Sequence, residues 1–251
     1  MNIFAPDYSG RPFVFFDGIH LATLGLILAL NLLFVRWSGR AGERTRVAFR
    51  YGAAGLLLLN EVVWVVWNRA TGQLSLQTGL PLHLCSVMVY VAVAVLVTRR
   101  QSLYEPLYFL GIGGAFQALM TPNIGAYGFP HIRFLSSFVS HGLILSVPVY
   151  LTLVEGMRPT WSSLRRVFVW GNLYLGFVGL VNWLIGSNYM FIARKPETPS
   201  LLDMMGPWPW YIIGMEVIGI ITMLALYMPF VLRDWLQAPD AGQEEQADLL
   251  R

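Results

Sequence analysis

The sequence predicts an all-α polytopic membrane protein, and three observations support this fold class. Hydrophobic residues make up 56% of the 251 residues, whereas charged residues make up only 12%. A soluble domain carries about 25% charged residues, well above this value. The mean hydropathy of +0.56 agrees. Finally, several apolar runs approach or exceed the roughly 18 to 20 residues that a membrane-spanning helix needs.

Seven spans can be drawn along the chain, about 18–36, 47–67, 81–98, 103–121, 132–154, 163–186 and 208–232. The fourth has the weakest signal, because "GIGGAFQALM" is rich in glycine and only moderately hydrophobic. We expect residues 1–236 to form one transmembrane domain. The polar, acidic stretch 237–251 lacks aromatic residues, so we expect a disordered cytoplasmic tail.

Basic residues between the spans predict the orientation. Those on one side number twelve: Arg36, Arg40, Arg44, Arg46, Arg50, Arg99, Arg100, Arg158, Arg165, Arg166, Arg233 and Arg251. Those on the other side number five: Arg11, Arg69, Arg133, Arg194 and Lys195. Cytoplasmic loops carry the excess of positive charge, so the N-terminus is predicted outside and the C-terminus in the cytoplasm.

Polar side chains within the predicted spans gather at one depth. At a rise of 1.5 Å per residue, they fall within roughly 15 Å of the outer surface. They are Asn60, Glu61, His83, Cys85, His141, Asn182 and Glu216. Because intramembrane polar groups usually face a cavity or the bundle interior, one outward-facing polar cavity explains them together. Taken singly, the amides could bridge helices, the glutamates could be paired, and the cysteine could be a small apolar filler.

The chemistry of this set favours a cysteine–histidine site. Pro81 suits the first position of a helix, which would place His83 and Cys85 in its opening turns. Residues two apart on a helix point in nearly opposite directions, so His83 is a poor base for Cys85. His141 is the better candidate for the general base, with Glu61 or Asn60 orienting it. His83 would then bind substrate or stabilise an oxyanion.

The depth of the site suggests a lipid substrate, since phospholipid ester bonds lie just beneath the headgroups. The irregular segment 186–211 adds Arg194 and Lys195, cations that can meet a phosphate. It also contributes Asn188 and Tyr189 to the predicted substrate-binding residues, together with Asn60, Glu61, Asn182 and Glu216. The alternative reading of this segment is an interfacial anchor, because Trp208, Trp210 and Tyr211 prefer headgroup level.

Other chemistries find less support in the residues. His83, His141 and a carboxylate could bind a metal, but the chain has no HExxH motif, so we expect no metal and no cofactor. Ser136, Ser137 and Ser140 beside His141 leave a serine–histidine site open, without a GxSxG signature. The expected partners are membrane lipids, not nucleic acid.

The stretches "LPLHLC", "FPHIRFLSSFVSHG" and "NYMFIARKPETPSLLDMMGPWPWY" resemble the YwaF-type bacterial integral membrane proteins. That family is distantly similar to the transmembrane protein 164 family, whose members transfer acyl chains to phospholipids. The resemblance implies that Cys85 matches a catalytic cysteine and His141 a catalytic histidine. We therefore expect a multi-pass protein of the cell membrane that transfers or hydrolyses lipid acyl groups at the outer leaflet. The alternative is a small-molecule transporter or ligand-binding protein that uses the same cavity.

Overall fold

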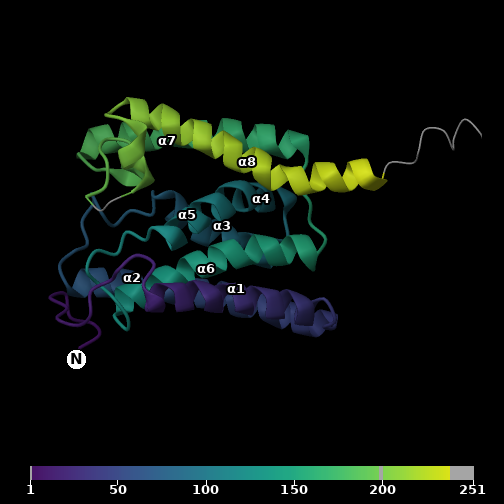
Figure 1. Ribbon diagram of the computed structural model, residues 1–251, viewed down its shortest axis with the longest axis horizontal. Helices are drawn as coiled ribbons and strands as arrows, with labels where there is room; N and C mark the ends of the chain where they lie inside the picture. Colours follow the sequence, from purple (N-terminus) through teal and green to yellow (C-terminus); the bar gives the residue numbers. More distant parts are fainter. Residues whose placement is uncertain (1, 198–199, 238–251) are drawn as a thin grey trace, which may run out of the picture.

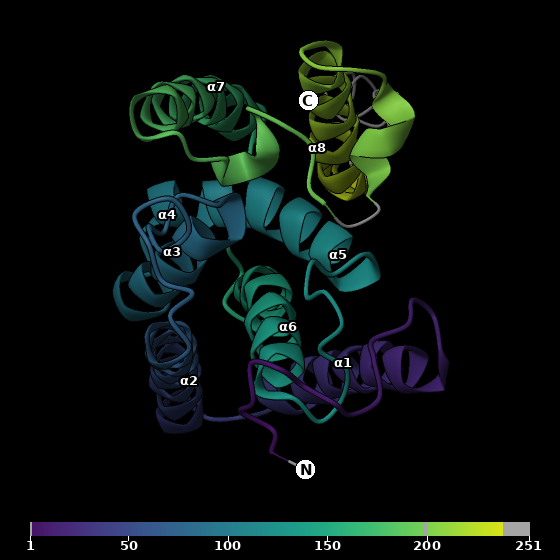
Figure 2. The same cartoon turned by 90° about the vertical axis from the view of Figure 1, so that its left-hand side faces the viewer.

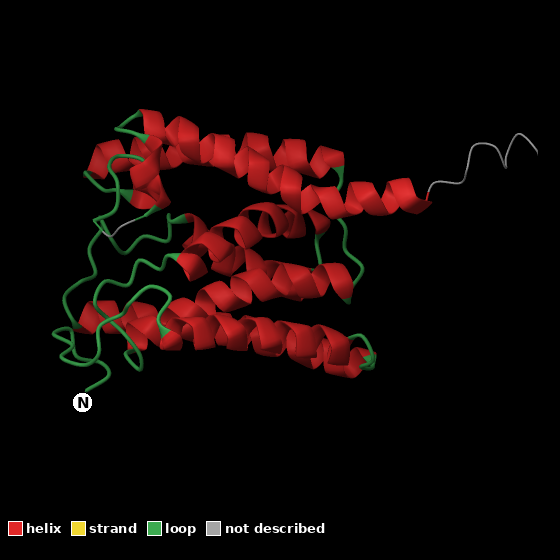
Figure 3. Cartoon of the chain, viewed as in Figure 1, coloured by secondary structure: helices red, strands yellow, loops and turns green. Residues whose placement is uncertain are grey.

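The computed structural model describes residues 2–197 and 200–237. Within these residues the secondary structure is helical, and Figure 3 draws no strand in them. The predicted tail, 237–251, lies outside the described residues except for Gln237, which ends the last helix.

In the described residues, seven long helical segments follow one another. Four continuous helices come from the first half and the middle: α1 (Gly18–Ser38), α2 (Glu43–Ala70), α3 (Leu84–Thr98) and α6 (Ile132–Leu153). A broken segment lies between α3 and α6, made of α4 (Gln101–Pro106), η1 (Leu107–Gly111) and α5 (Ile112–Met120). The second half has α7 (Trp161–Ile185), two short turns, η2 (Tyr189–Phe191) and η3 (Leu201–Met205), and α8 (Trp210–Gln237).

The helices run up and down, so their connections collect at two ends (Figure 1). We call one the loop end, because it holds the N-terminal segment and the long connections 71–83, 121–131 and 186–209. The other is the short-turn end, which holds the connections 39–42, 99–100 and 154–160 and the end of α8. Viewed from the loop end, α7 and α8 form one layer, α3 to α5 the next, and α1, α2 and α6 lie beyond them (Figure 2).

Five of these helices are long and apolar enough to cross a membrane: α1, α2, α6, α7 and α8. This agrees with a polytopic membrane protein. At 1.5 Å per residue, the 15 residues of α3 reach only about 22 Å. The segment from Gln101 to Met120 contains Pro106, which lacks an N–H, and the following turn has π-helical geometry. The count of seven spans therefore stays a prediction.

The apolar core lies between α2, α3, the α4–α5 segment and α6, where Leu57, Ala92, Leu107 and Ile144 are fully buried. In its most apolar 18-residue stretch, α6 has 50% of its residues buried, whereas α1 has 6% and α7 and α8 have 11% each. The outer helices thus present apolar side chains outward, the arrangement that contact with lipid favours over contact with water.

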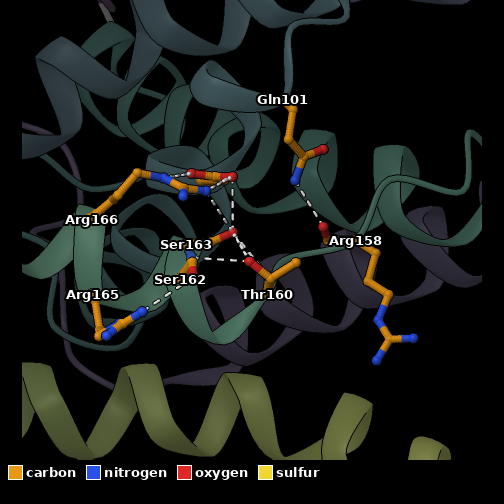
Figure 4. A network of polar contacts seen from close by, with 8 residues as sticks. Gln101, Arg158, Thr160, Ser162, Ser163, Arg165 and Arg166 are labelled. Atoms are coloured by element: carbon orange, nitrogen blue, oxygen red, sulfur yellow. Dashed lines mark hydrogen bonds and ion pairs between the residues drawn. The ribbon is translucent and has the colours of Figure 1, made fainter.

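A polar contact joins α7 to the core layer at the short-turn end (Figure 4). Thr160 and Ser163 form a capping box at the start of α7. The Ser163 hydroxyl also donates to Glu105 of α4 at 2.8 Å, and Arg166 pairs with the same carboxylate at 2.7 Å. These contacts fix the start of α7 against α4, beside the buried Leu164 and Val167.

Candidate active site

Cys85 is the second residue of α3 and is half-buried. Its sulfur lies 3.5 Å from the point where a Cβ on Gly114 would stand, so it rests against the backbone of α5. The helix begins at Leu84, three residues after Pro81, so the prediction that Pro81 opens the helix is wrong. Pro81 and Leu82 instead form a turn, in which the Leu82 carbonyl accepts a hydrogen bond from the Tyr174 hydroxyl at 2.9 Å.

His83 is the N-cap residue of α3, but its side chain does not cap the helix. Its Nδ1 accepts a hydrogen bond from the Met190 amide at 3.2 Å. The ring packs against Tyr189 and Phe191, each with centroids 5.3 Å away. His83 therefore faces the 186–209 segment, whereas Cys85 faces α5. With Nδ1 accepting, the neutral ring carries its proton on Nε2, which is then a hydrogen-bond donor.

His141 lies on α6 and is half-buried. Its Nδ1 is 2.8 Å from the Ser137 carbonyl of the preceding turn, so we assign the proton to Nδ1 as the donor. The Nε2 lone pair is then left to accept a proton. The orienting group is this backbone carbonyl rather than Asn60 or Glu61: the Asn60 amide donates to the Ser136 carbonyl at 3.2 Å and so links α2 to α6.

Cys85 and His141 lie at the same level beside α5. Ile144 of α6 reaches to 3.5 Å from the Cβ position of Gly111. On α6, His141 is three residues nearer the loop end than Ile144. On the neighbouring segment, Gly114 is three residues nearer the loop end than Gly111. Each step is about 4.5 Å along its helix axis. His141 is thus level with Gly114, which Cys85 touches. Among the described residues, no hydrogen bond joins Cys85 to a histidine.

Three of the predicted substrate-binding residues organise the 186–209 segment. Asn182 accepts from the Ser187 hydroxyl at 2.7 Å and from the Tyr189 amide at 2.8 Å, and donates to the Tyr189 carbonyl. The Tyr189 hydroxyl donates to Leu76 O and accepts from the Leu80 amide. Asn188 bonds the backbone of Ala193 and Arg194. These bonds place the Met190 amide that holds His83.

The remaining predicted residues lie on other elements. Arg194 is exposed, and Lys195 lies 4.0 Å from Asp203 and 5.8 Å from the Tyr211 ring. Glu216 of α8 accepts from the Asn172 amide of α7 at 3.2 Å, an interhelical contact. Glu61 is half-buried on α2.

Two hollows in the described part of the chain lie elsewhere. One is between the N-terminal segment and the start of α6, and the other lies along the loop end of α2. None of the predicted site residues lines either hollow. No group of three or more potential metal ligands lies together in the described residues.

Sequence reasoning missed the backbone contacts of the site. The Ser137 carbonyl and the Met190 amide orient the two histidines, and Gly114 leaves room for the cysteine sulfur. Of these three contacts, only the one between the Ser137 carbonyl and His141 could be expected from the sequence, because residues four apart on a helix are neighbours.

A bundle of helices, five of them long and apolar enough to cross a membrane, defines the class: a multi-pass membrane protein. Its family follows from comparison, since the model of the TMEM164 family matches residues 15–227. The chain belongs to the TMEM164 family. It is also 26% identical over 227 residues to an uncharacterized protein of Treponema pallidum (strain Nichols), covering 87% of this chain and 90% of the relative. No solved structure matches it significantly.

Proposed function

We propose that this chain is a multi-pass protein of the cell membrane that moves acyl groups of membrane lipids through Cys85 and His141. The observation that carries the proposal is that a backbone group orients each of two histidines, His83 two residues before Cys85 and His141 on the neighbouring helix α6. His141 offers a free Nε2 lone pair, and His83 offers an Nε2–H donor. A base and an oxyanion donor are the two groups that a thiol nucleophile needs. We also propose that the chain belongs to the YwaF-type subgroup, crosses the membrane seven times and acts at the outer leaflet.

The proposed reaction has two steps, acylation of Cys85 and transfer of the acyl group to an acceptor. His141 Nε2 takes the thiol proton of Cys85, directly or through one water, and the sulfur attacks the ester carbonyl carbon of a lipid. The carbonyl oxygen becomes an oxyanion that accepts a hydrogen bond from His83. The C–O bond then breaks, the lysolipid oxygen takes the proton from His141, and the acyl group remains on Cys85 as a thioester.

In the second step, His141 removes the proton from a hydroxyl group of an acceptor lipid. That oxygen attacks the thioester carbonyl, the C–S bond breaks, and the proton returns to the Cys85 sulfur. If water replaces the acceptor lipid, the outcome is hydrolysis. We assign Arg194 and Lys195 to the lipid phosphate, because both are cations on the loop-end segment that holds His83. Asn182, Asn188 and Tyr189 shape that segment.

The test is acyl transfer by the purified protein in phosphatidylcholine vesicles that contain a fluorescent-acyl phospholipid and a lysophospholipid acceptor. We expect a hydroxylamine-sensitive acyl adduct on Cys85 by intact-protein mass spectrometry. Cys85→Ala should abolish adduct and transfer. His141→Ala should lower the rate by about 10²- to 10⁴-fold, the usual contribution of a general base. His83→Ala should lower it by about 10²- to 10³-fold, as for loss of an oxyanion donor.

The matched control is Ser140→Ala, next to His141 on the same helix, which should keep the wild-type rate. Unchanged transfer in folded Cys85→Ala protein would exclude the acyl-cysteine mechanism. If Ser140→Ala removed the activity instead, the nucleophile would be a serine. Substrate transport without acyl turnover would favour the transporter alternative.

A further inference from the structure

A second polar cluster lies at the short-turn end, away from Cys85 and His141. We call it the Glu155 cluster, and it comprises Arg50 of α2, Arg99 after α3, and Tyr150 and Glu155 at the end of α6. The Glu155 carboxylate is buried. One of its oxygens accepts from the Tyr150 hydroxyl at 2.6 Å, and the other lies 2.8 Å from Arg99 Nη2. Both oxygens therefore have close partners.

Arg50 is left with unsatisfied donors in this cluster. Only 7% of its surface is exposed, yet its Nε and Nη1 atoms have no hydrogen-bond partner among the described residues. Glu155 is 3.8 Å from Arg50 Nη1, which is an ion-pair distance but too long for a hydrogen bond. Buried guanidinium donors without acceptors are costly, so the site lacks an oxygen acceptor.

The charges of the cluster are also unbalanced. Arg50 and Arg99 contribute two positive charges, and Glu155 contributes one negative charge. Glu43 stands 3.8 Å from Arg50 Nη2, but its side chain is 64% exposed, so solvent weakens this ion pair. An anion that took the place of Glu43 would meet Arg50 at Nη2. Arg99, with a side chain 47% exposed, is open to the same anion.

Exposed apolar residues are neighbours of the cluster along the chain. Tyr51, Val97 and Leu153 are exposed and lie within two residues of Arg50, Arg99 and Glu155. An anion with acyl chains fits this combination better than a free ion does, since its chains cover the apolar side chains. We propose that the Glu155 cluster binds the phosphate group of an anionic phospholipid in the leaflet facing the short-turn end, with Arg50 and Arg99 as donors and Glu43 displaced.

The experiment compares protein in nanodiscs of phosphatidylcholine alone with nanodiscs that contain increasing fractions of phosphatidylglycerol. A lipid that binds only the folded state raises the unfolding midpoint with its concentration. We expect phosphatidylglycerol to raise the midpoint, and native mass spectrometry to retain it on the protein. Arg99→Gln should weaken the apparent affinity by about fivefold, the usual effect of one arginine near an anionic surface.

Two variants separate this site from general charge effects. Arg100→Gln removes the neighbouring exposed arginine, outside the cluster, and should leave phosphatidylglycerol binding unchanged. Glu43→Gln removes the competing carboxylate and should tighten binding, whereas a purely structural role for Glu43 predicts no gain. The test uses these two variants and Arg99→Gln, so it stays valid even if a variant of the buried arginine, Arg50→Gln, does not fold.

Three results would overturn the proposal. The first is that phosphatidylglycerol stabilises the protein no more than phosphatidylcholine does. The second is that Arg100→Gln weakens binding as much as Arg99→Gln, which would indicate a diffuse surface effect. The third is that inorganic phosphate in phosphatidylcholine nanodiscs reproduces the whole stabilisation, which would make the cluster a site for the free anion rather than for a lipid.

Discussion

The buried imidazole of His131 holds the N-terminal segment against the loop end. Its Nε2 donates to the Ala5 carbonyl at 3.0 Å, and its Nδ1 accepts from the Arg133 amide at 3.1 Å, capping α6. The ring also stacks on Tyr127 at 4.3 Å. Only the neutral ring can make both hydrogen bonds, because a proton on Nδ1 would meet the Arg133 N–H.

This arrangement predicts a pH dependence. Burial lowers the pKa of His131 below its ordinary value, the hydrogen bond to Ala5 opposes this shift, and the Arg133 charge adds to it. The unfolded chain therefore binds a proton at a pH where the folded protein does not. The stabilisation is complete above about pH 6.5, the ordinary histidine pKa. It is lost progressively as the pH falls from there through the lowered folded-state pKa.

Thermal unfolding midpoints measured in detergent between pH 8 and pH 5 test this expectation. The midpoint of the wild type should fall with acidification. His131→Asn keeps an N-cap acceptor but has no imidazole, so its midpoint should fall less. Parallel curves for the two proteins would show that other groups cause the acid dependence.

At the scale of single residues, helix rise predicts a common depth for Cys85 and His141, and this depth stays a prediction. The contacts of the two histidines are harder to predict. The tautomers of His83 and His141 depend on the Met190 amide and the Ser137 carbonyl. Backbone groups carry no residue identity, so no motif announces them. The sequence leaves two roles for Asn60, a site residue or a bridge between helices. In the structure it bridges α2 to α6.

At the scale of elements, α7 is attached at its two ends rather than along its length. Its exposed face includes Trp170, Phe177 and Trp183. At the short-turn end it is held through Glu105, and at the loop end through the Asn182 bonds to Ser187 and Tyr189. Polar contacts and the buried Leu164, Val167 and Val178 together hold α7 in place.

Glu105→Gln should release the short-turn end of α7. The carboxylate accepts from Ser163 once and from Arg166 twice, at 2.7 and 3.2 Å. A hydrogen bond to a charged acceptor contributes about 1.5–3 kcal/mol and one to a neutral acceptor about 0.5–1.5 kcal/mol, so the change of acceptor for the buried Ser163 hydroxyl should cost about 1 kcal/mol. Solvent weakens the ion pair with the exposed Arg166. Arg165→Gln, one residue away and exposed, is the control. Equal denaturant midpoints for Glu105→Gln and wild type would show that α7 is held by packing alone.

Apolar runs predicted the helices, and the misplaced start of α3 shows the limit of this reasoning. Pro81 had the residue type of a first helical position, but long-range contacts hold the turn before α3. The Leu80 amide donates to the Tyr189 hydroxyl, and the Leu82 carbonyl accepts from Tyr174. Both tyrosines come from about a hundred residues further along the chain. The fourth predicted span, whose signal is weak, is a broken segment with a π-helical turn after Pro106.

At the scale of the whole molecule, the charge distribution follows the two ends of the bundle. Eleven of the twelve arginines predicted to be cytoplasmic belong to the described residues, and they lie on the connections or the helix turns of the short-turn end. With an odd number of crossings, the N-terminal segment and the end of α8 fall on opposite sides, as Figure 1 draws them. The positive-inside rule then predicts that the short-turn end faces the cytoplasm.

Cysteine accessibility in intact cells tests both the orientation and the number of crossings. In a Cys85→Ala background, Thr78→Cys, Arg100→Cys and Ala126→Cys introduce thiols before α3, after α3 and after α5, all at exposed positions. A membrane-impermeant maleimide should label Thr78→Cys and Ala126→Cys but not Arg100→Cys, which should react only after permeabilisation. This pattern requires that both the short helix α3 and the broken α4–α5 segment cross the bilayer. Labelling of all three from outside would mean that neither segment crosses, and a reversed pattern would place the loop end in the cytoplasm.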